Sequence, residues 1–244
     1  PLTIDGGLHI EIGSLFDGGD ALREIQPRVN ASYLVLGTWR AKASYGRFSQ
    51  RMLTVGNEDD VISIFDAWIR VPREMKPQQA DHYVMGLSGS LTEQATVNIE
   101  TYYKRYNSLV VYNRDKIDAS DPDYIQGDGN SYGAEVTIRS HSQYVDLYGT
   151  YSLSYAKINN GGFVYVPRYD RRHHINLMAI GHPARGLTTT VKWEFGSGFP
   201  FSQTVGYFDR LTLDNALPGQ FESETGSPYI MLGPKNAARL PAYH

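Results

Sequence analysis

The 244-residue sequence contains no cysteine and little charge, since only 20% of its residues are Asp, Glu, Lys or Arg. Without cysteine the chain has no disulfide framework, no thiolate metal site and no cysteine nucleophile. Its 23 basic and 26 acidic side chains leave a formal net charge of −3. Proteins that bind nucleic acid usually carry a basic excess, so nucleic acid is not an expected partner.

Long apolar segments are also missing from the sequence. No window of eighteen residues is apolar and free of charge, which excludes a transmembrane helix. Residues 1–5 provide neither the basic nor the apolar region of a signal peptide. We therefore expect either a cytosolic protein or a mature or partial chain.

Tyrosine and glycine are abundant: the chain has 18 Tyr against 9 Phe and 3 Trp, together with 24 Gly. Tyrosine favours strands and combines an apolar ring with a polar hydroxyl group. This composition suits antiparallel β proteins in which each strand has one wet and one apolar face. Barrels of outer membranes belong to that class.

Apolar and polar residues alternate with a period of two, which is typical of β-strands. The alternation is clearest over residues 144–155 and 188–195. It recurs at Leu8–Ile12, Val29–Val35, Trp39–Tyr45, Tyr83–Leu87, 95–105, Ala134–Ile138 and Ile175–Ala179. No segment of similar length has a helical period. The sequence predicts nine strands, with a tenth opening at Arg239.

The expected connections differ at the two ends of the strands. Short links are predicted near residues 36–37, 92–94, 141–143 and 182–186. The alternate links are long, at residues 51–80, 114–131, 159–170 and 205–238, and only the link at residues 17–20 is short. Short turns at one end and long loops at the other are typical of transmembrane β-barrels.

The two faces of the expected strands support the same class. The apolar face has aromatic residues near strand ends, namely Trp39, Tyr45, Tyr103, Tyr155, Trp193 and Phe195. The other face carries Arg40, Lys42, Glu100, Lys104, Glu135, Arg139, Lys192 and Glu194. Burying so many charges costs several kcal/mol each unless all are paired, whereas a hydrated lumen removes that cost. We predict an all-β, antiparallel, up-and-down transmembrane β-barrel segment, with a soluble sheet that has one solvated face as the alternative.

Several stretches resemble the later part of the barrel of TonB-dependent outer-membrane receptors. Residues 169–173 (YDRRH) followed by residues 193–200 (WEFGSGFP) are the most specific of them. The others are residues 26–30, 43–50, 81–83 with Gly86, 100–104, 131–135 and 239–244. The resemblance rests on the order and spacing of these short motifs over most of the chain.

The resemblance implies a 22-stranded barrel, filled by an N-terminal plug, in the outer membrane of a Gram-negative-type bacterium. Nine or ten strands are too few for a plugged lumen of that size, and lipid does not tolerate open strand edges. Residues 1–244 are therefore expected to be a partial barrel without the plug and the final strands. The implied partners are TonB, acting through the plug with its inner-membrane energising complex, outer-membrane lipid, a transported small ligand, and a surface lipoprotein or larger outer-membrane complex.

The sequence offers no catalytic residues, and no cofactor is expected. Adjacent His173 and His174 point to opposite faces of a strand, so they do not readily share a metal ion. The loop aspartates Asp118, Asp121, Asp123 and Asp128 hint at calcium but lack the order of an EF-hand. Neither group is expected to bind a metal.

Ligand contact is expected in the long loops, where barrels carry their variable function. The candidate residues are Trp68, Arg70 and Arg73 in loop 51–80, and Tyr207, Phe208 and Arg210 in loop 205–238. Aromatic rings with arginine suit an anionic chelate or a glycan. Alternatively these rings pack the loops against one another. Residues 61–65 are a candidate for an extra loop strand.

The function that these features favour is TonB-dependent active uptake of a scarce ligand such as a metal chelate, vitamin, glycan or peptide. Enzymatic activity is not expected. The alternatives are a passive porin-like channel, a scaffold barrel in a surface complex, and a soluble β-sheet binding module.

Overall fold

A computed structural model describes residues 1–13, 22–55, 67–72, 74–113, 116, 120–208 and 229–243. Every regular element within these ranges is a β-strand. In the same ranges no helix has the length and apolar character needed to cross a membrane. The candidate residues Arg73 and Arg210, the aspartate Asp118 and the expected strand at 61–65 lie outside the described residues.

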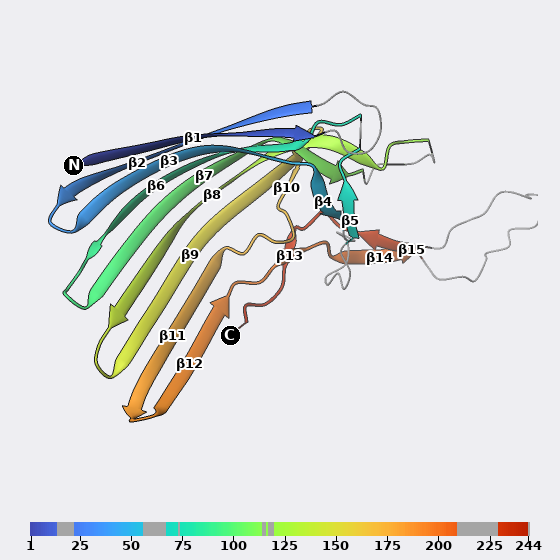
Figure 1. Cartoon of the computed structure of the whole chain (residues 1–244). Coiled ribbons are helices and arrows are strands. Elements are labelled where there is room, and N and C mark those ends of the chain that lie inside the picture. Colours follow the sequence, from blue (N-terminus) through green and yellow to red (C-terminus); the bar gives the residue numbers. More distant parts are fainter. Residues whose placement is uncertain are drawn as a thin grey trace, which may run out of the picture.

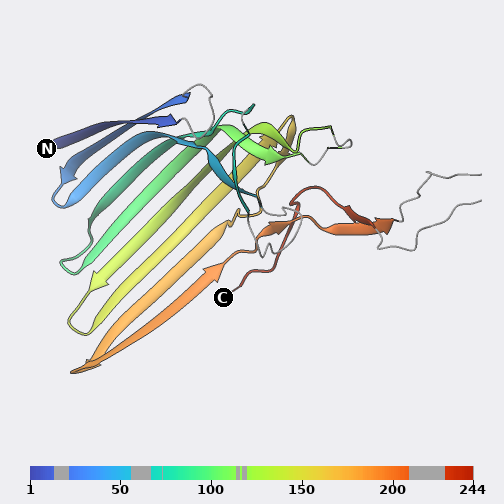
Figure 2. The same ribbon diagram turned by 45° about the vertical axis from the view of Figure 1, so that its right-hand side comes forward.

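Nine long strands form one antiparallel sheet in which each strand pairs with the next along this path. They are β1 (Leu2–Gly13), β2 (Leu22–Leu36), β3 (Trp39–Gln50), β6 (Gln78–Ser90), β7 (Ala95–Tyr112), β8 (Tyr124–His141), β9 (Val145–Asn160), β11 (His173–Ala184) and β12 (Leu187–Gly196). The predicted all-β, up-and-down architecture is confirmed. Figures 1 and 2 show that the sheet is curved along its width.

The tenth strand of this sheet is β10 (Phe163–Tyr165), which folds back along the end of β9. The tenth strand predicted at Arg239 takes a different place. Arg239 belongs to β16 (Ala238–Arg239), which pairs with β13 (Pro200–Phe201) in a separate two-stranded sheet. Pairing with the main sheet begins at Tyr243, whose backbone exchanges two hydrogen bonds of 3.0 Å with Gly196 at the end of β12.

The two ends of the sheet are unlike, as the sequence predicts. One end, here called the turn end, has short links at residues 37–38, 91–94, 142–144 and 185–186. Gly37 and Gly186 lie there with φ values of 57° and 80°, a conformation that favours glycine in two-residue hairpin turns. The other end, the loop end, carries the longer connections and the hairpin of β4 (Met52–Val55) with β5 (Ala67–Arg70) (Figure 1). It also carries the hairpin of β14 (Thr204–Phe208) with β15 (Tyr229–Leu232).

The strands at the loop end are longer than the sequence predicts. Residues 124–131, expected in a loop, belong to β8, and its first residue, Tyr124, pairs with Tyr112 of β7. A small apolar cluster of Val111, Ile158 and Tyr165 packs under this extension. The glycines of this segment favour the prediction of a loop, because strand interiors rarely contain glycine. At Gly129, however, a Cβ atom would lie 2.6 Å from the Lys157 carbonyl oxygen, so the close backbone approach requires glycine.

One face of the sheet, here called the outer face, is apolar and exposed. Met85 is 70% exposed, Ile4 64% and Val191 62%, and no apolar residue in the described part of the chain is fully buried. Along β9 the outer face runs from Val145 to Tyr155, which corresponds to about 33 Å at 3.3 Å per residue. A strand tilted by about 40° then spans about 25 Å, the height of the apolar band of transmembrane barrels.

Five tyrosines lie in register across the outer face near the loop end. This tyrosine row consists of Tyr45, Tyr83, Tyr103, Tyr132 and Tyr155, each the pairing partner of the next. Ring centroids are 5.2 Å apart for Tyr45 and Tyr83, 6.4 Å apart for Tyr83 and Tyr103, and 5.3 Å apart for Tyr132 and Tyr155. A ring-shaped belt of tyrosines is typical of the boundary between hydrocarbon and headgroups.

If the outer face contacts lipid, Ile99→Arg in the middle of that face should lower the stability of the protein folded into lipid vesicles by about 2–4 kcal/mol, because a cation at mid-bilayer is poorly solvated. The matched control is Ser152→Arg, since Ser152 lies on the opposite face across from Glu135. The control should change the folding free energy by less than about 1 kcal/mol. Urea titration of the lipid-inserted protein measures both, and equal losses would show that the outer face does not contact lipid.

Candidate functional site

The second face of the sheet, here called the inner face, is charged and polar. The register aligns Lys42, Gly86, Glu100, Glu135 and Ser152 in one row across five strands. Glu100 lies directly opposite Glu135, a pairing that no spacing in the sequence reveals. Like charges in directly opposed positions destabilise a sheet, and more strongly where water is excluded. The inner face is therefore suited to contact with water.

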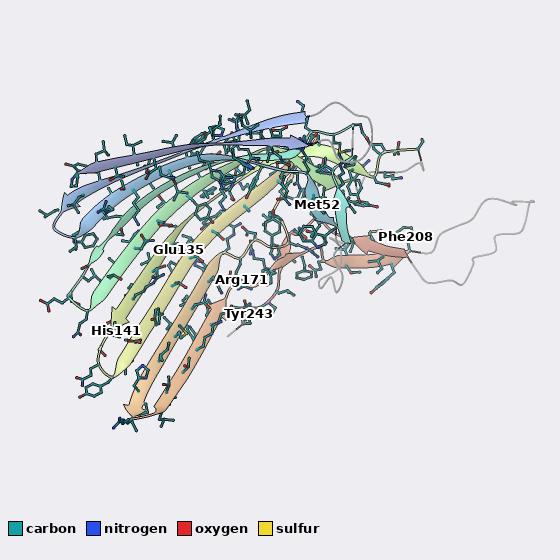
Figure 3. All side chains as sticks on the ribbon, in the orientation of Figure 1. Met52, Glu135, His141, Arg171, Phe208 and Tyr243 are labelled. Atoms are coloured by element: carbon teal, nitrogen blue, oxygen red, sulfur yellow. The ribbon has the colours of Figure 1, made fainter. Side chains whose placement is uncertain are left out.

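The inner face is hollowed between β3 and β8. One hollow of about 520 Å³ is lined by residues that include Arg40, Lys42, Glu135 and Arg139. A smaller hollow of about 170 Å³ lies beside it and includes Lys42 and Asp5. Figure 3 shows Glu135 midway along the sheet, away from both ends. Charges of both signs on a concave surface can bind water and polar solutes.

The hairpin of β4 and β5 positions two of the predicted ligand residues at the loop end. Trp68 and Arg70 are two residues apart on β5, so their side chains share one face of the hairpin. The Trp68 side chain is 67% exposed, and Arg70 is also exposed. The structure therefore brings an aromatic ring and a guanidinium group together, as a grip on an anionic ligand requires.

The hairpin of β14 and β15 carries the other two described candidates. Tyr207 is 67% exposed and Phe208 is 49% exposed, and as neighbours on one strand they point to opposite faces. Tyr207 pairs with Ile230, which is 58% exposed. This side of the hairpin is an exposed apolar surface. The two hairpins form separate sheets, so Trp68 and Tyr207 belong to different elements.

A buried carboxylate joins residues of β9 and β16 to the segment just before β11 at the loop end. Asp170 is only 2% exposed, and its side chain accepts a hydrogen bond of 2.8 Å from the backbone N–H of Ala156. Arg172 Nε lies 3.0 Å from Asp170 Oδ2, and Arg239 Nη2 donates to the same oxygen. Arg239 also donates to the carbonyl groups of Asp170 and Gly198, at 3.0 and 3.1 Å. One carboxylate thus links three segments that are distant in sequence.

The two most specific stretches, residues 169–173 and 193–200, therefore meet residues 239–243 at one place. The Arg171 guanidinium lies 4.5 Å from the centroid of the Phe199 ring and 4.9 Å from that of Tyr243. Figure 3 shows Arg171 and Tyr243 together at the end of the sheet. At Gly198 a Cβ atom would lie 1.6 Å from the Leu240 carbonyl oxygen, so this position requires glycine. The motifs build a packed junction at the loop end.

The side chains that hint at a metal site have other partners. His173 contacts the Tyr151 hydroxyl group at 3.0 Å, whereas His174 Nε2 lies 2.8 Å from Glu194 Oε1. Lys116 Nζ donates a hydrogen bond of 2.8 Å to Asp123, which raises the pKa of the lysine. Within the described ranges, no three His, Asp or Glu side chains are close enough to hold a metal ion.

Comparison with known proteins identifies a likeness in structure. Neither the models of known families nor the curated proteins give a match to the sequence. Among solved structures, the sheet is similar to the ferric-catecholate import receptor Fiu from E. coli K12 in its closed form, with a TM-score of 0.57 and 15% identity. The match covers 79% of this chain but only 27% of the receptor chain. At this identity the likeness establishes the antiparallel up-and-down fold.

We predict that Asp170→Asn loosens the junction, because removing one partner of a buried ion pair costs about 3–5 kcal/mol. Hydrogen exchange should become faster at the Leu240 and Tyr243 amides, which bond to Phe199 and Gly196. Asp123→Asn is the matched control, since it removes an exposed carboxylate whose ion pair contributes little. Unchanged exchange in Asp170→Asn would show that the carboxylate does not hold the segments together.

Proposed function

We propose that this chain forms part of the barrel wall of a TonB-dependent transporter in the outer membrane of a Gram-negative-type bacterium. The single observation that carries the proposal is the contrast between the two faces of one curved sheet. The outer face is apolar, exposed and bordered by the tyrosine row, and the inner face carries unpaired charges such as Glu100 and Glu135. Lipid on one side and water on the other satisfy both faces at once.

The proposal includes a larger, closed barrel of about 22 strands. The edge strands of the described sheet are β1 and β12, and unpaired backbone groups at such edges are not tolerated in lipid. Tyr243 already pairs with Gly196 beside β12, in the position where a further strand would continue the sheet. The chain also spans only 27% of the length of the similar receptor, which supports a place for it in a larger assembly.

In the proposed mechanism the loops capture the ligand, a plug outside this chain seals the lumen, and TonB-linked work rearranges the plug. The described residues contribute the wall, the hydrated inner face and parts of the capturing loops. Trp68 with Arg70 and Tyr207 with Phe208 are the proposed contacts, as are Arg73 and Arg210. A metal chelate is the first ligand class to test, because the similar receptor imports ferric catecholates. Vitamins, glycans and peptides are the other classes.

A passive, porin-like channel is the second candidate, and the charged, hollowed inner face favours it. A scaffold barrel in a surface complex is the third, favoured by the exposed apolar side of the β14–β15 hairpin, where Tyr207 and Ile230 lie. In a passive channel the loops need no ligand affinity, and in a scaffold they bind protein. Energy dependence of uptake separates the first candidate from the other two.

We expect the full-length protein, produced in a Gram-negative host without its own catecholate receptors, to appear in the outer membrane and to confer uptake of a ferric catecholate. A protonophore should abolish the uptake, because the energy passes from the inner membrane through TonB. Uptake that persists with the protonophore would favour the passive channel. Membrane location without uptake of any chelate would move the search to the other ligand classes.

We predict that Trp68→Ala weakens ligand binding at least about fivefold, since exposed tryptophans that become buried on binding commonly contribute more than 1 kcal/mol. Tyr207→Ala should have an effect of the same sign. Tyr144→Ala is a matched control, because Tyr144 is also 67% exposed but lies at the turn end. Equilibrium binding to cells or to purified protein measures all three. Equal affinities in the three variants would remove both hairpins from the binding site.

A further inference from the structure

A second row of outward-pointing side chains lies two residues beyond the tyrosine row, toward the loop end. It consists of Arg47, Asp81, Arg105, Asn130 and Lys157, again each the pairing partner of the next. These residues share the face of the tyrosines because side chains two residues apart on a strand point the same way. The outer face thus changes from apolar to charged within one step of the pleat.

The charges at one side of this row satisfy each other. Asp81 is 6% exposed and accepts hydrogen bonds from Arg47 Nε at 2.8 Å and from Arg47 Nη2 at 3.2 Å. The Tyr45 hydroxyl group and the Asn107 amide also donate to Asp81, at 2.9 and 2.6 Å. Arg47 and Asp81 therefore contribute no net charge to the surface.

The other side of the row has an excess of positive charge. Arg105 and Lys157 are exposed, and no ion pair joins either of them to another residue in the described ranges. They flank Asn130 on the neighbouring strands, which places their Cα atoms about 10 Å apart at the usual strand spacing. On β8, Asp128 lies one row further out, where it accepts a hydrogen bond of 3.0 Å from Asn159. Two cations and an amide thus face the same space.

The depth of this group matches the headgroup layer of a membrane. Two residues correspond to about 7 Å along a strand, or about 5 Å in depth at a tilt of about 40°. The polar layer on each side of a bilayer is about 5–8 Å thick. If the tyrosine row marks the hydrocarbon boundary, Arg105, Asn130 and Lys157 lie among the headgroups. Directly beneath them the exposed rings of Tyr103 and Tyr132 offer an apolar surface to an acyl chain, while the Arg172 guanidinium lies 4.1 Å from the centroid of the Tyr155 ring.

We propose that Arg105, Asn130 and Lys157 form a binding site for the phosphate group of an anionic lipid in the leaflet at the loop end. The inference rests on the membrane location in the proposed function. The tyrosines below the cations favour a lipid over free phosphate, because they would contact the acyl chain of the same molecule. The Arg47–Asp81 pair marks the limit of the site on the side of β3 and β6.

The test uses the full-length protein in vesicles of a zwitterionic phospholipid that contain a small share of spin-labelled anionic or zwitterionic lipid. The fraction of immobilised label gives the relative affinity of each lipid. With about 1 kcal/mol for each cation near a charged lipid, we expect a preference of about 10–30-fold for the anionic lipid. The double variant Arg105→Gln/Lys157→Gln should reduce that preference to less than about threefold.

Lys104→Gln/Lys192→Gln is the matched control, because it removes two cations from the inner face. This control should keep the preference for the anionic lipid. A wild-type protein that inserts but shows no preference would overturn the site alone, as would equal losses in both double variants. Complete displacement of the lipid by inorganic phosphate would show a simple anion site instead. Failure of the wild type to insert would overturn the membrane location and the lipid site together.

Discussion

The antiparallel hydrogen-bond ladder is the interaction on which the rest of this structure depends. Because side chains alternate along a strand, a shift of one residue in any pairing would exchange the two faces of that strand. The observed register instead keeps five tyrosines in one row and places Lys42, Glu100 and Glu135 in another row on the opposite face. Each row combines residues from strands that are distant in sequence. Register therefore determines both the boundary of the apolar face and the position of the inner charges.

Two buried carboxylates stabilise the loop end of the sheet. Asp81 joins β3, β6 and β7 through Arg47, Tyr45 and Asn107, while Asp170 joins residues near β9, β11 and β16. Both accept several charged or polar donors, which offsets the cost of burying their charge. Asp81 lies beyond the tyrosine row, and Asp170 lies in the connection between β10 and β11. The polar groups of both residues are therefore outside the apolar band. The hairpins and connections at the loop end are thus attached to a fixed rim.

The sequence predicts the parts of this structure that depend on local pattern. Period-two alternation identified all nine long strands, and the spacing of turn residues identified the unlike ends. The alternation within one strand does not show how that strand aligns with the next. The sequence therefore did not predict that Tyr83 and Tyr132 belong to one row, or that Glu135 lies opposite Glu100. Glycine misled the prediction at 124–131, because Gly127 and Gly129 look like loop residues but permit close backbone approach inside β8. The sequence also did not predict the junction at Asp170, because Asp170 and Arg239 are about 70 residues apart and no local pattern relates them.

The absence of any fully buried apolar residue in the described ranges follows from the same division of faces. A soluble sheet of this size would need a second layer to cover residues such as Ile4, Met85 and Val191, because exposed apolar patches of that extent favour association. A second layer over the inner face would instead have to neutralise Arg40, Lys42, Glu100 and Glu135 without water. Neither face is therefore suited to packing against protein, and only a solvent that differs between the two sides suits both. The proposed membrane location, with a water-filled interior, would provide that difference, and the cations two residues beyond the tyrosine row would then lie where the hydrocarbon ends.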